Sequence, residues 1–64
     1  MSDRGRYVIE FRSGAFFQSL DAKTGGPIVT AQRFASRRDA TKLADEHPWI
    51  WANGGCVLDA DTIG

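Results

Sequence analysis

The first part of the chain alternates apolar and polar residues with the two-residue period of a β-strand. In Tyr7–Arg12 the odd-numbered side chains are aromatic or aliphatic and fall on one side of the strand. Ser13 and Gly14 follow as a turn pair, and Ala15–Leu20 has the composition of a returning strand. The pattern therefore predicts an antiparallel hairpin.

A third strand is expected at Ile28–Ala31. This run is short, β-branched and apolar, and it follows the clear break Gly25-Gly26-Pro27. Gln32 and Arg33 then lead toward a helical segment.

The segment 33–47 has the 3.6-residue period of an amphipathic helix. Ser36 stands at the expected N-cap and Asp39 follows three residues later, a variant of the capping box. Pro48 disfavours helical geometry at His47 and should end the helix there. The apolar stripe is narrow and consists of Ala40, Leu43, Ala44 and His47. Because small residues allow close approach, we expect this helix to lie flat on a sheet.

The chain after Pro48 is expected to return to the sheet. Trp49–Ala52 reads as an extended segment, Asn53-Gly54 as a tight turn, and Cys56–Asp59 as a fourth strand. The predicted class is α+β, with an antiparallel sheet of three to four strands and one helix on one face, in the order β-β-β-α-β. The expected core consists of Tyr7, Ile9, Phe11, Phe16, Val29, Phe34, Ala40, Leu43, Ala44 and Val57.

The length of 64 residues predicts one domain over 1–64, with an ordered core at about 6–60. A single cysteine cannot form an internal disulfide, which favours a reducing cytosol. The N-terminus lacks the apolar run of a signal peptide, and no stretch is long enough to span a membrane. We expect a monomer.

Catalytic and metal chemistry find little support in the sequence. Cys56 and His47 are the lone thiol and imidazole, and nothing in their spacing implies a nucleophile–base pair. Cys56 is expected to be a small buried hydrophobe in its strand, and His47 to suit the negative end of its helix. Two ligands are too few for structural zinc. We therefore expect no enzyme activity, no cofactor and no metal.

Two tryptophans are the most informative side chains outside the core. In an extended segment Trp49 and Trp51 would face the same side, next to the acidic pair Asp45 and Glu46. Two indoles rimmed by carboxylates could anchor a protein interface, or they could plug the end of a small core. The interface hypothesis assigns one contiguous surface to Asp45, Glu46, Trp49, Trp51, Asp59 and Asp61.

The charges divide unevenly along a chain of zero net charge. Residues 1–38 carry seven basic and three acidic residues, and residues 39–64 carry one basic and five acidic residues. A basic cluster around the start of the helix offers an alternative, nucleic-acid-binding surface formed by Arg33, Arg37, Arg38 and Lys42. The balanced total charge argues against strong non-specific binding of nucleic acid.

The layout of residues 7–59 resembles that of small phage and prophage proteins. The resemblance rests on YVIEFRSGAFF, on AQRFASRRDATKLA and on the short closing strand. Anti-CRISPR and other anti-defence proteins are similar in size and compactness, which implies a non-enzymatic inhibitor that binds a host nuclease complex. Phe34–Ala40 also resembles the helix opening of integrase arm-binding domains. The balanced charge and the fourth strand depart from that second family, so the inhibitor is the favoured hypothesis.

Overall fold

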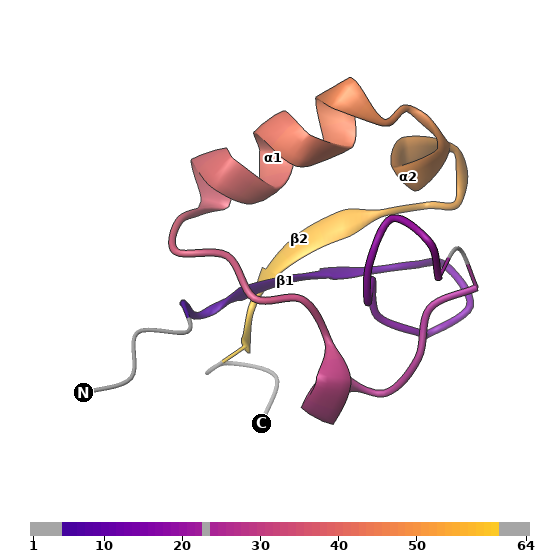
Figure 1. The fold of residues 1–64 in the computed structure, drawn as a ribbon, viewed down its shortest axis with the longest axis horizontal. Helices are drawn as coiled ribbons and strands as arrows, with labels where there is room; N and C mark the ends of the chain where they lie inside the picture. The colour runs from indigo at the N-terminus through magenta and orange to yellow at the C-terminus, as the bar shows by residue number, and fades with distance from the viewer. Residues whose placement is uncertain (1–4, 23, 61–64) are drawn as a thin grey trace.

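The computed structural model describes residues 5–22 and 24–60. Their elements, in chain order, are strand β1 (Tyr7–Glu10), the 3-10 helix η1 (Ile28–Thr30), helix α1 (Arg37–Glu46), helix α2 (Trp49–Ala52) and strand β2 (Cys56–Asp59). Strands β1 and β2 pair side by side and α1 crosses above them, whereas η1 lies on the opposite side of β1 (Figure 1). The predicted α+β class is confirmed, with fewer strands and one more α-helix than expected.

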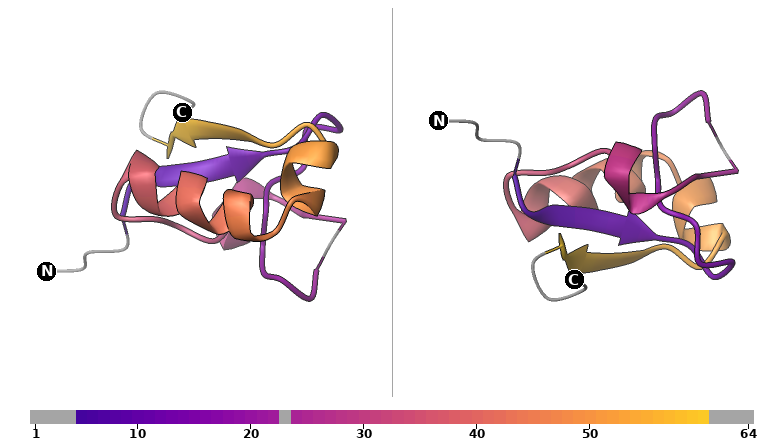
Figure 2. Two further views of the ribbon diagram at one scale, coloured as in Figure 1. Left: turned by 90° about the horizontal axis from the view of Figure 1, so that it is seen from above. Right: turned by 90° about the horizontal axis from the view of Figure 1, so that it is seen from below.

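Strand β1 is the centre of the fold. It pairs antiparallel with β2 in a register that sets Tyr7 opposite Asp59 and Ile9 opposite Val57. Its other edge is occupied at two points, by Phe34 opposite Tyr7 and by Phe16 opposite Glu10. The views from above and below show α1 lying along one face of this pair (Figure 2).

The predicted second strand, Ala15–Leu20, is wrong as a continuous strand. The hairpin closes as expected, since the Phe11 N–H donates to the Ala15 carbonyl at 2.8 Å and Phe17 donates to Ile9 at 2.8 Å. Beyond that point the segment leaves β1, and Phe16 exchanges hydrogen bonds with Gly26 instead, at 2.7 and 2.9 Å. The rings of Phe16 and Phe17 are both buried. Neighbouring residues of a strand point to opposite faces, so this segment cannot be a strand with one face in solvent.

The predicted third strand is also wrong, because Ile28–Thr30 forms a single 3-10 turn. The Thr30 N–H donates to the Pro27 carbonyl at 3.3 Å, and Ala31 donates to Ile28 at 3.1 Å. Val29 lies at the surface of this turn with 80% of its area exposed, so its assignment to the core is wrong. A β-branched composition leads to a strand only where the segment pairs with a neighbouring strand. Residues 28–30 follow the Phe16–Gly26 bridge, and no bridge is recorded for them within the described part of the chain.

The main helix is confirmed at both ends. The Ser36 side chain accepts a hydrogen bond from the Asp39 N–H at 3.2 Å, as an N-cap does. Helix α1 ends at Glu46, and the His47 N–H closes its last turn. Ala40 and Ala44 are fully buried against the sheet, which is how the small-residue stripe was expected to pack.

The segment after Pro48 is helical, so its prediction as an extended segment is wrong. Pro48 itself has helical dihedrals, φ −54° and ψ −21°, and begins the turn of α2. Proline suits the start of a helix because its missing N–H is not needed there. Ile50 is fully buried and its N–H donates to the His47 carbonyl at 2.9 Å. The apolar side chain at the centre of WIWA therefore turns inward.

The core is built around stacked and tilted aromatic rings. The Phe17 ring lies between Phe11, Phe34 and Trp49, with centroid distances of 6.0 to 6.4 Å. Tyr7 and Leu43 are only partly buried, whereas Val8, Phe17 and Ile50 are core residues that the pattern missed. The confirmed core positions are Ile9, Phe11, Phe16, Phe34, Ala40, Ala44 and Val57.

Cys56 is exposed, which corrects its assignment to the core. The register explains this, since Cys56 pairs with Glu10 at the start of β2 and points to the side opposite the core residue Val57. Among the described residues, no helix has the length and apolar character needed to cross a membrane.

Candidate functional site

The exposed tryptophan is held in a defined orientation. Trp51 lies on α2 with 40% of its surface exposed. Its indole Nε1–H donates to Oδ1 of Asp45, on the last turn of α1, at 2.9 Å. The hydrogen bond links the two helices at the corner where the chain turns around Pro48. The ring therefore presents apolar surface to solvent while its polar atom already has a partner.

The second tryptophan belongs to the core. Trp49 is half-buried, and its ring centroid lies 6.0 Å from those of both Phe11 and Phe17. Because α2 is helical, residues two apart point in directions that differ by about 200°. The expectation that both indoles face one side is therefore wrong. Trp49 fills the end of the core, which was the alternative that the sequence left open.

The structure does not bring the proposed acidic residues together. Asp45 and Glu46 are exposed at the end of α1. Asp59 lies at the other end of the molecule, where Oδ2 accepts from Arg6 Nη2 at 2.9 Å and Oδ1 from Nε at 3.3 Å. Asp61 falls outside the described residues. Among the described residues of this set, Asp45 and Trp51 are joined by their hydrogen bond and Glu46 follows Asp45 in the chain; we call these three residues the Trp51 patch.

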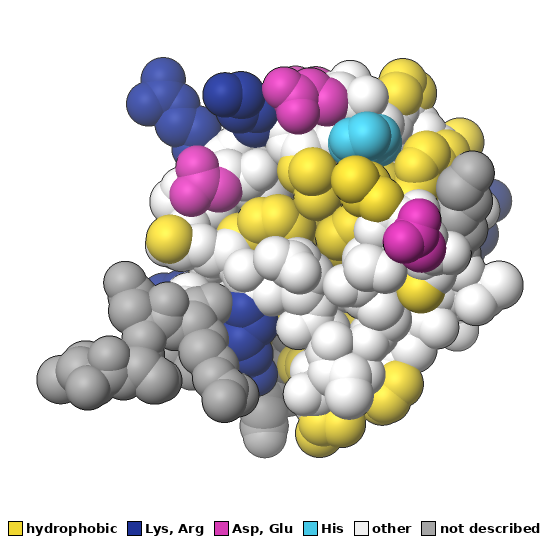
Figure 3. All heavy atoms as spheres, viewed as in Figure 1, with side chains coloured by type: hydrophobic (Ala, Val, Ile, Leu, Met, Phe, Trp, Pro, Cys, Tyr) yellow, Lys and Arg dark blue, Asp and Glu magenta, His cyan; other side chains and the backbone are white. Residues whose placement is uncertain are grey.

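Three of the four proposed basic residues, Arg37, Arg38 and Lys42, border one hollow on α1, and Arg33 lies apart from them. Arg37 turns toward the sheet, where Nη1 donates to the Val57 carbonyl at 3.2 Å and the guanidinium lies 5.5 Å from the centre of the Tyr7 ring. Arg33 lines a shallow surface formed by the loop after η1. Arg38 and Lys42 share the outer face of α1 with Asp39, Asp45 and Glu46. Blue basic side chains stand next to magenta acidic ones at the top of the molecule (Figure 3), so this face is mixed in charge.

The carboxylates of the Trp51 patch stand at an unfavourable end of their helix. The C-terminus of an α-helix carries partial negative charge, so acids there typically cost about 0.3–1 kcal/mol each at low ionic strength. The last turn of α1 contains Asp45 and Glu46 and no basic residue. The last turn itself therefore does not compensate its two negative charges, and the nearest basic residue on the same face is Lys42, one turn earlier.

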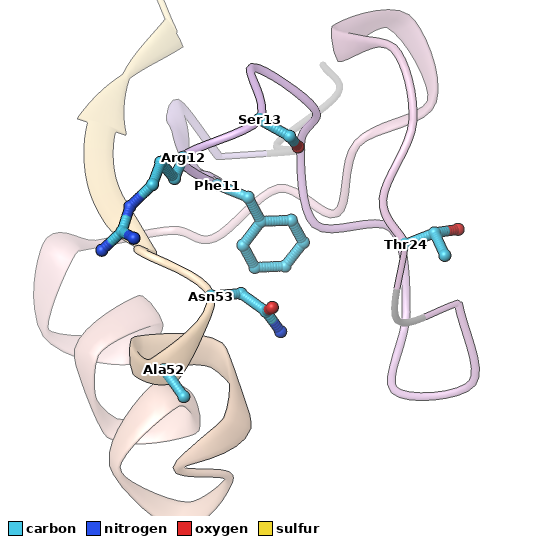
Figure 4. Close-up of a pocket in the computed structure, with 6 residues that line it drawn as sticks. All are labelled: Phe11, Arg12, Ser13, Thr24, Ala52 and Asn53. Carbon is cyan, nitrogen blue, oxygen red and sulfur yellow. The ribbon is translucent and has the colours of Figure 1, made fainter.

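A hollow lies beside α2, and contacts around it position this short helix. The sequence analysis did not predict this hollow. It is lined by Phe11, Arg12, Ser13, Thr24, Ala52 and Asn53. The Phe11 ring points toward Asn53, whereas the Arg12 side chain points away from that ring (Figure 4).

A backbone hydrogen bond joins the hairpin turn to the end of α2 at this hollow, and a side-chain hydrogen bond closes the end of α2. The Arg12 N–H donates to the Asn53 carbonyl at 3.0 Å, and Asn53 Nδ2 donates to the Trp49 carbonyl at 2.9 Å. Phe11 is only 5% exposed and offers little surface to a ligand. We interpret these contacts as the support that fixes α2, and with it Trp51.

The lone thiol and imidazole lie on different elements. Cys56 is exposed at the start of β2, and His47 follows the last residue of α1 with its N–H donating to Leu43 and Ala44. Among residues 5–22 and 24–60, no cluster of three or more His, Cys, Asp or Glu side chains is arranged to hold a metal ion. The described surface carries an exposed indole whose donor is bonded to the carboxylate of Asp45.

Comparison of the chain with family models, with curated proteins and with solved structures finds no match.

Proposed function

We propose that this chain is a non-enzymatic binding protein that acts by protein–protein contact through the Trp51 patch. The observation that carries the proposal is the state of Trp51: exposed, oriented, and hydrogen-bonded to Asp45 through its polar atom. Tryptophan is enriched among residues that dominate binding energy, and truncating such a residue costs about 2 kcal/mol or more.

The geometry suits an interface because binding leaves no indole donor to be satisfied. A partner that covers Trp51 removes apolar surface from water while the Nε1–H keeps its bond to Asp45. In this proposal the exposed carboxylates of Asp45 and Glu46 form the rim of the interface. Rim charges mainly raise the rate of association and contribute less to the lifetime of the complex.

The resemblance to anti-defence proteins supports a host nuclease complex as the partner and inhibition as the outcome. Such a complex binds nucleic acid through a positively charged groove. The carboxylates at the end of α1 have the opposite sign, and Trp51 adds an apolar anchor whose contribution salt does not screen. In this proposal Asp45 and Glu46 compete for part of the groove, and Asp59 takes no part.

A matched pair of truncations tests the proposal. Leu20 is exposed to the same extent as Trp51, 40%, but belongs to the loop before η1. Tagged wild type, Trp51→Ala and Leu20→Ala are used to capture partners from host lysate, and affinity for the recovered complex is then measured. We expect Trp51→Ala to weaken binding by about 30-fold or more, and Leu20→Ala to leave it nearly unchanged. Equal affinities for the two variants would contradict the proposal.

A further inference from the structure

The two strands differ in how their edges are used. One edge of β1 pairs with β2, and on the other edge Tyr7 exchanges hydrogen bonds with Phe34 at 2.9 and 3.2 Å. The Ile9 carbonyl on that same edge accepts from Phe17 at 2.8 Å. Within residues 5–22 and 24–60, no strand or bridge pairs with the outer edge of β2. An edge of this kind can accept another strand.

The register shows which groups of β2 point outward. The Ala60 N–H donates to the Arg6 carbonyl, so this opposed pair is of the hydrogen-bonded type. Such pairs alternate along an antiparallel ladder, which makes Val8 and Leu58 the next one. Val57 lies between them, and its N–H and carbonyl therefore point away from β1.

Arg37 covers the outward carbonyl of Val57. Its Nη1 donates to that oxygen at 3.2 Å, and its guanidinium lies over the Tyr7 ring at 5.5 Å from the centroid. Arg37 is the first residue of α1, and the N-cap Ser36 fixes the start of that helix. The arginine thus closes the strand edge from the helix side, as charged side chains do on natural edge strands.

We propose that the outer edge of β2 is a pairing surface for a second copy of this chain, and that Arg37 keeps it closed. A two-fold axis at Val57 would let the two Val57 residues exchange N–H···O=C bonds, and Arg37 occupies that carbonyl in each copy. In this register Cys56 faces Leu58 of the second copy. The two Asp59 residues fall at opposite ends of the pair, so the repulsion of like charges directly opposite each other is avoided.

The test compares Arg37→Met with Arg38→Met. Both remove one positive charge from the first turn of α1, but of the two side chains it is Arg37 that donates to the Val57 carbonyl of β2. Molar mass is measured by light scattering across a wide range of protein concentration. We expect wild type and Arg38→Met to stay monomeric, and the mass of Arg37→Met to double as concentration rises.

Cys56 reports whether the association uses β2. On one face of an antiparallel pair, diagonal neighbours lie about 7–8 Å apart, so the two exposed thiols should react with one short bismaleimide. We expect a cross-linked dimer of Arg37→Met and none of Arg38→Met. If Arg37→Met fails to fold, Arg37→Lys provides the same two measurements, since it keeps the cation but loses the planar donor. A folded Arg37 variant that stays monomeric, that associates without cross-linking, or that associates no more than Arg38→Met would overturn the proposal.

Discussion

The side chain of Trp51 combines exposed apolar area with a satisfied donor, and both properties come from neighbours in the fold. Asp45 supplies the acceptor at 2.9 Å, and the end of α2 is held by the bond from Arg12 N–H to the Asn53 carbonyl. The sequence places Asp45 near the tryptophans, but residue spacing does not indicate the contact between Arg12 and Asn53. Single residues thus acquire their role here through helix α2, which the sequence pattern did not predict.

Gly54 is the residue whose replacement should most directly disturb this support. Its φ is +80°, and a Cβ there would lie 2.7 Å from the Cβ of Arg12. Gly14 has a similar φ of +92° but nothing within 4 Å of the corresponding position. We expect Gly54→Ala to lower the free energy of unfolding by at least 1 kcal/mol more than Gly14→Ala does, because both share the backbone strain and only one adds a clash.

Urea denaturation of the two alanine variants measures that difference. Equal losses for Gly54→Ala and Gly14→Ala would show that the close approach of Gly54 to Arg12 is not a constraint on the fold.

Local chemistry was readable where it depends on neighbours in sequence. The cap at Ser36, the stop at His47 and the buried alanines of the helix follow from short-range rules, and all are confirmed. Cys56 was assigned wrongly because the face on which it lies depends on the register with Glu10, and sequence alone did not determine that register.

At the scale of elements, the errors share a cause in short apolar runs. A four-residue run such as WIWA has too few residues for periodicity to separate a strand from a helical turn. Pro48 was read as the end of α1, which is correct, but the same residue also begins α2. The run at Ile28 has the composition of a strand but is too short for that composition to decide, and it forms the 3-10 turn η1.

The burial of Ile50 on α2 and the exposure of Val29 on η1 give a prediction about stability. Ile50 is fully buried, whereas Val29 on η1 is 80% exposed. We expect Ile50→Ala to lower the free energy of unfolding by about 2–5 kcal/mol, from lost transfer energy and the resulting cavity. Val29→Ala should change it by no more than about 0.5 kcal/mol.

Thermal or urea unfolding of these two variants provides the comparison. If Val29→Ala lowered the free energy of unfolding as much as Ile50→Ala does, Val29 would have to be buried, as the predicted third strand requires.

At the scale of the whole molecule, folding mixes the basic and acidic halves of the chain. Arg6 pairs with Asp59 across the β1–β2 ladder, and α1 carries both signs on its outer face. The fold class was predictable because one strong helix and the flanking strands suffice to define it. The candidate site was predictable in part, since Asp45, Glu46 and Trp51 do lie at one corner. Its extension to Trp49 depended on an extended segment that the structure replaces with a helix, and Asp59 lies instead at the end of β2, paired with Arg6.

The central claim is that Trp51, and not Trp49, meets the partner. The most direct measurement is ¹⁹F NMR of the chain labelled with 5-fluorotryptophan, with each resonance assigned from a Trp→Phe variant, before and after addition of the captured partner complex. We predict that the Trp51 resonance of the bound chain changes chemical shift as its exposed ring is covered. The resonance of Trp49, which packs against Phe11 and Phe17, should keep its shift. A complex that forms while the Trp51 resonance keeps its free chemical shift would contradict the account.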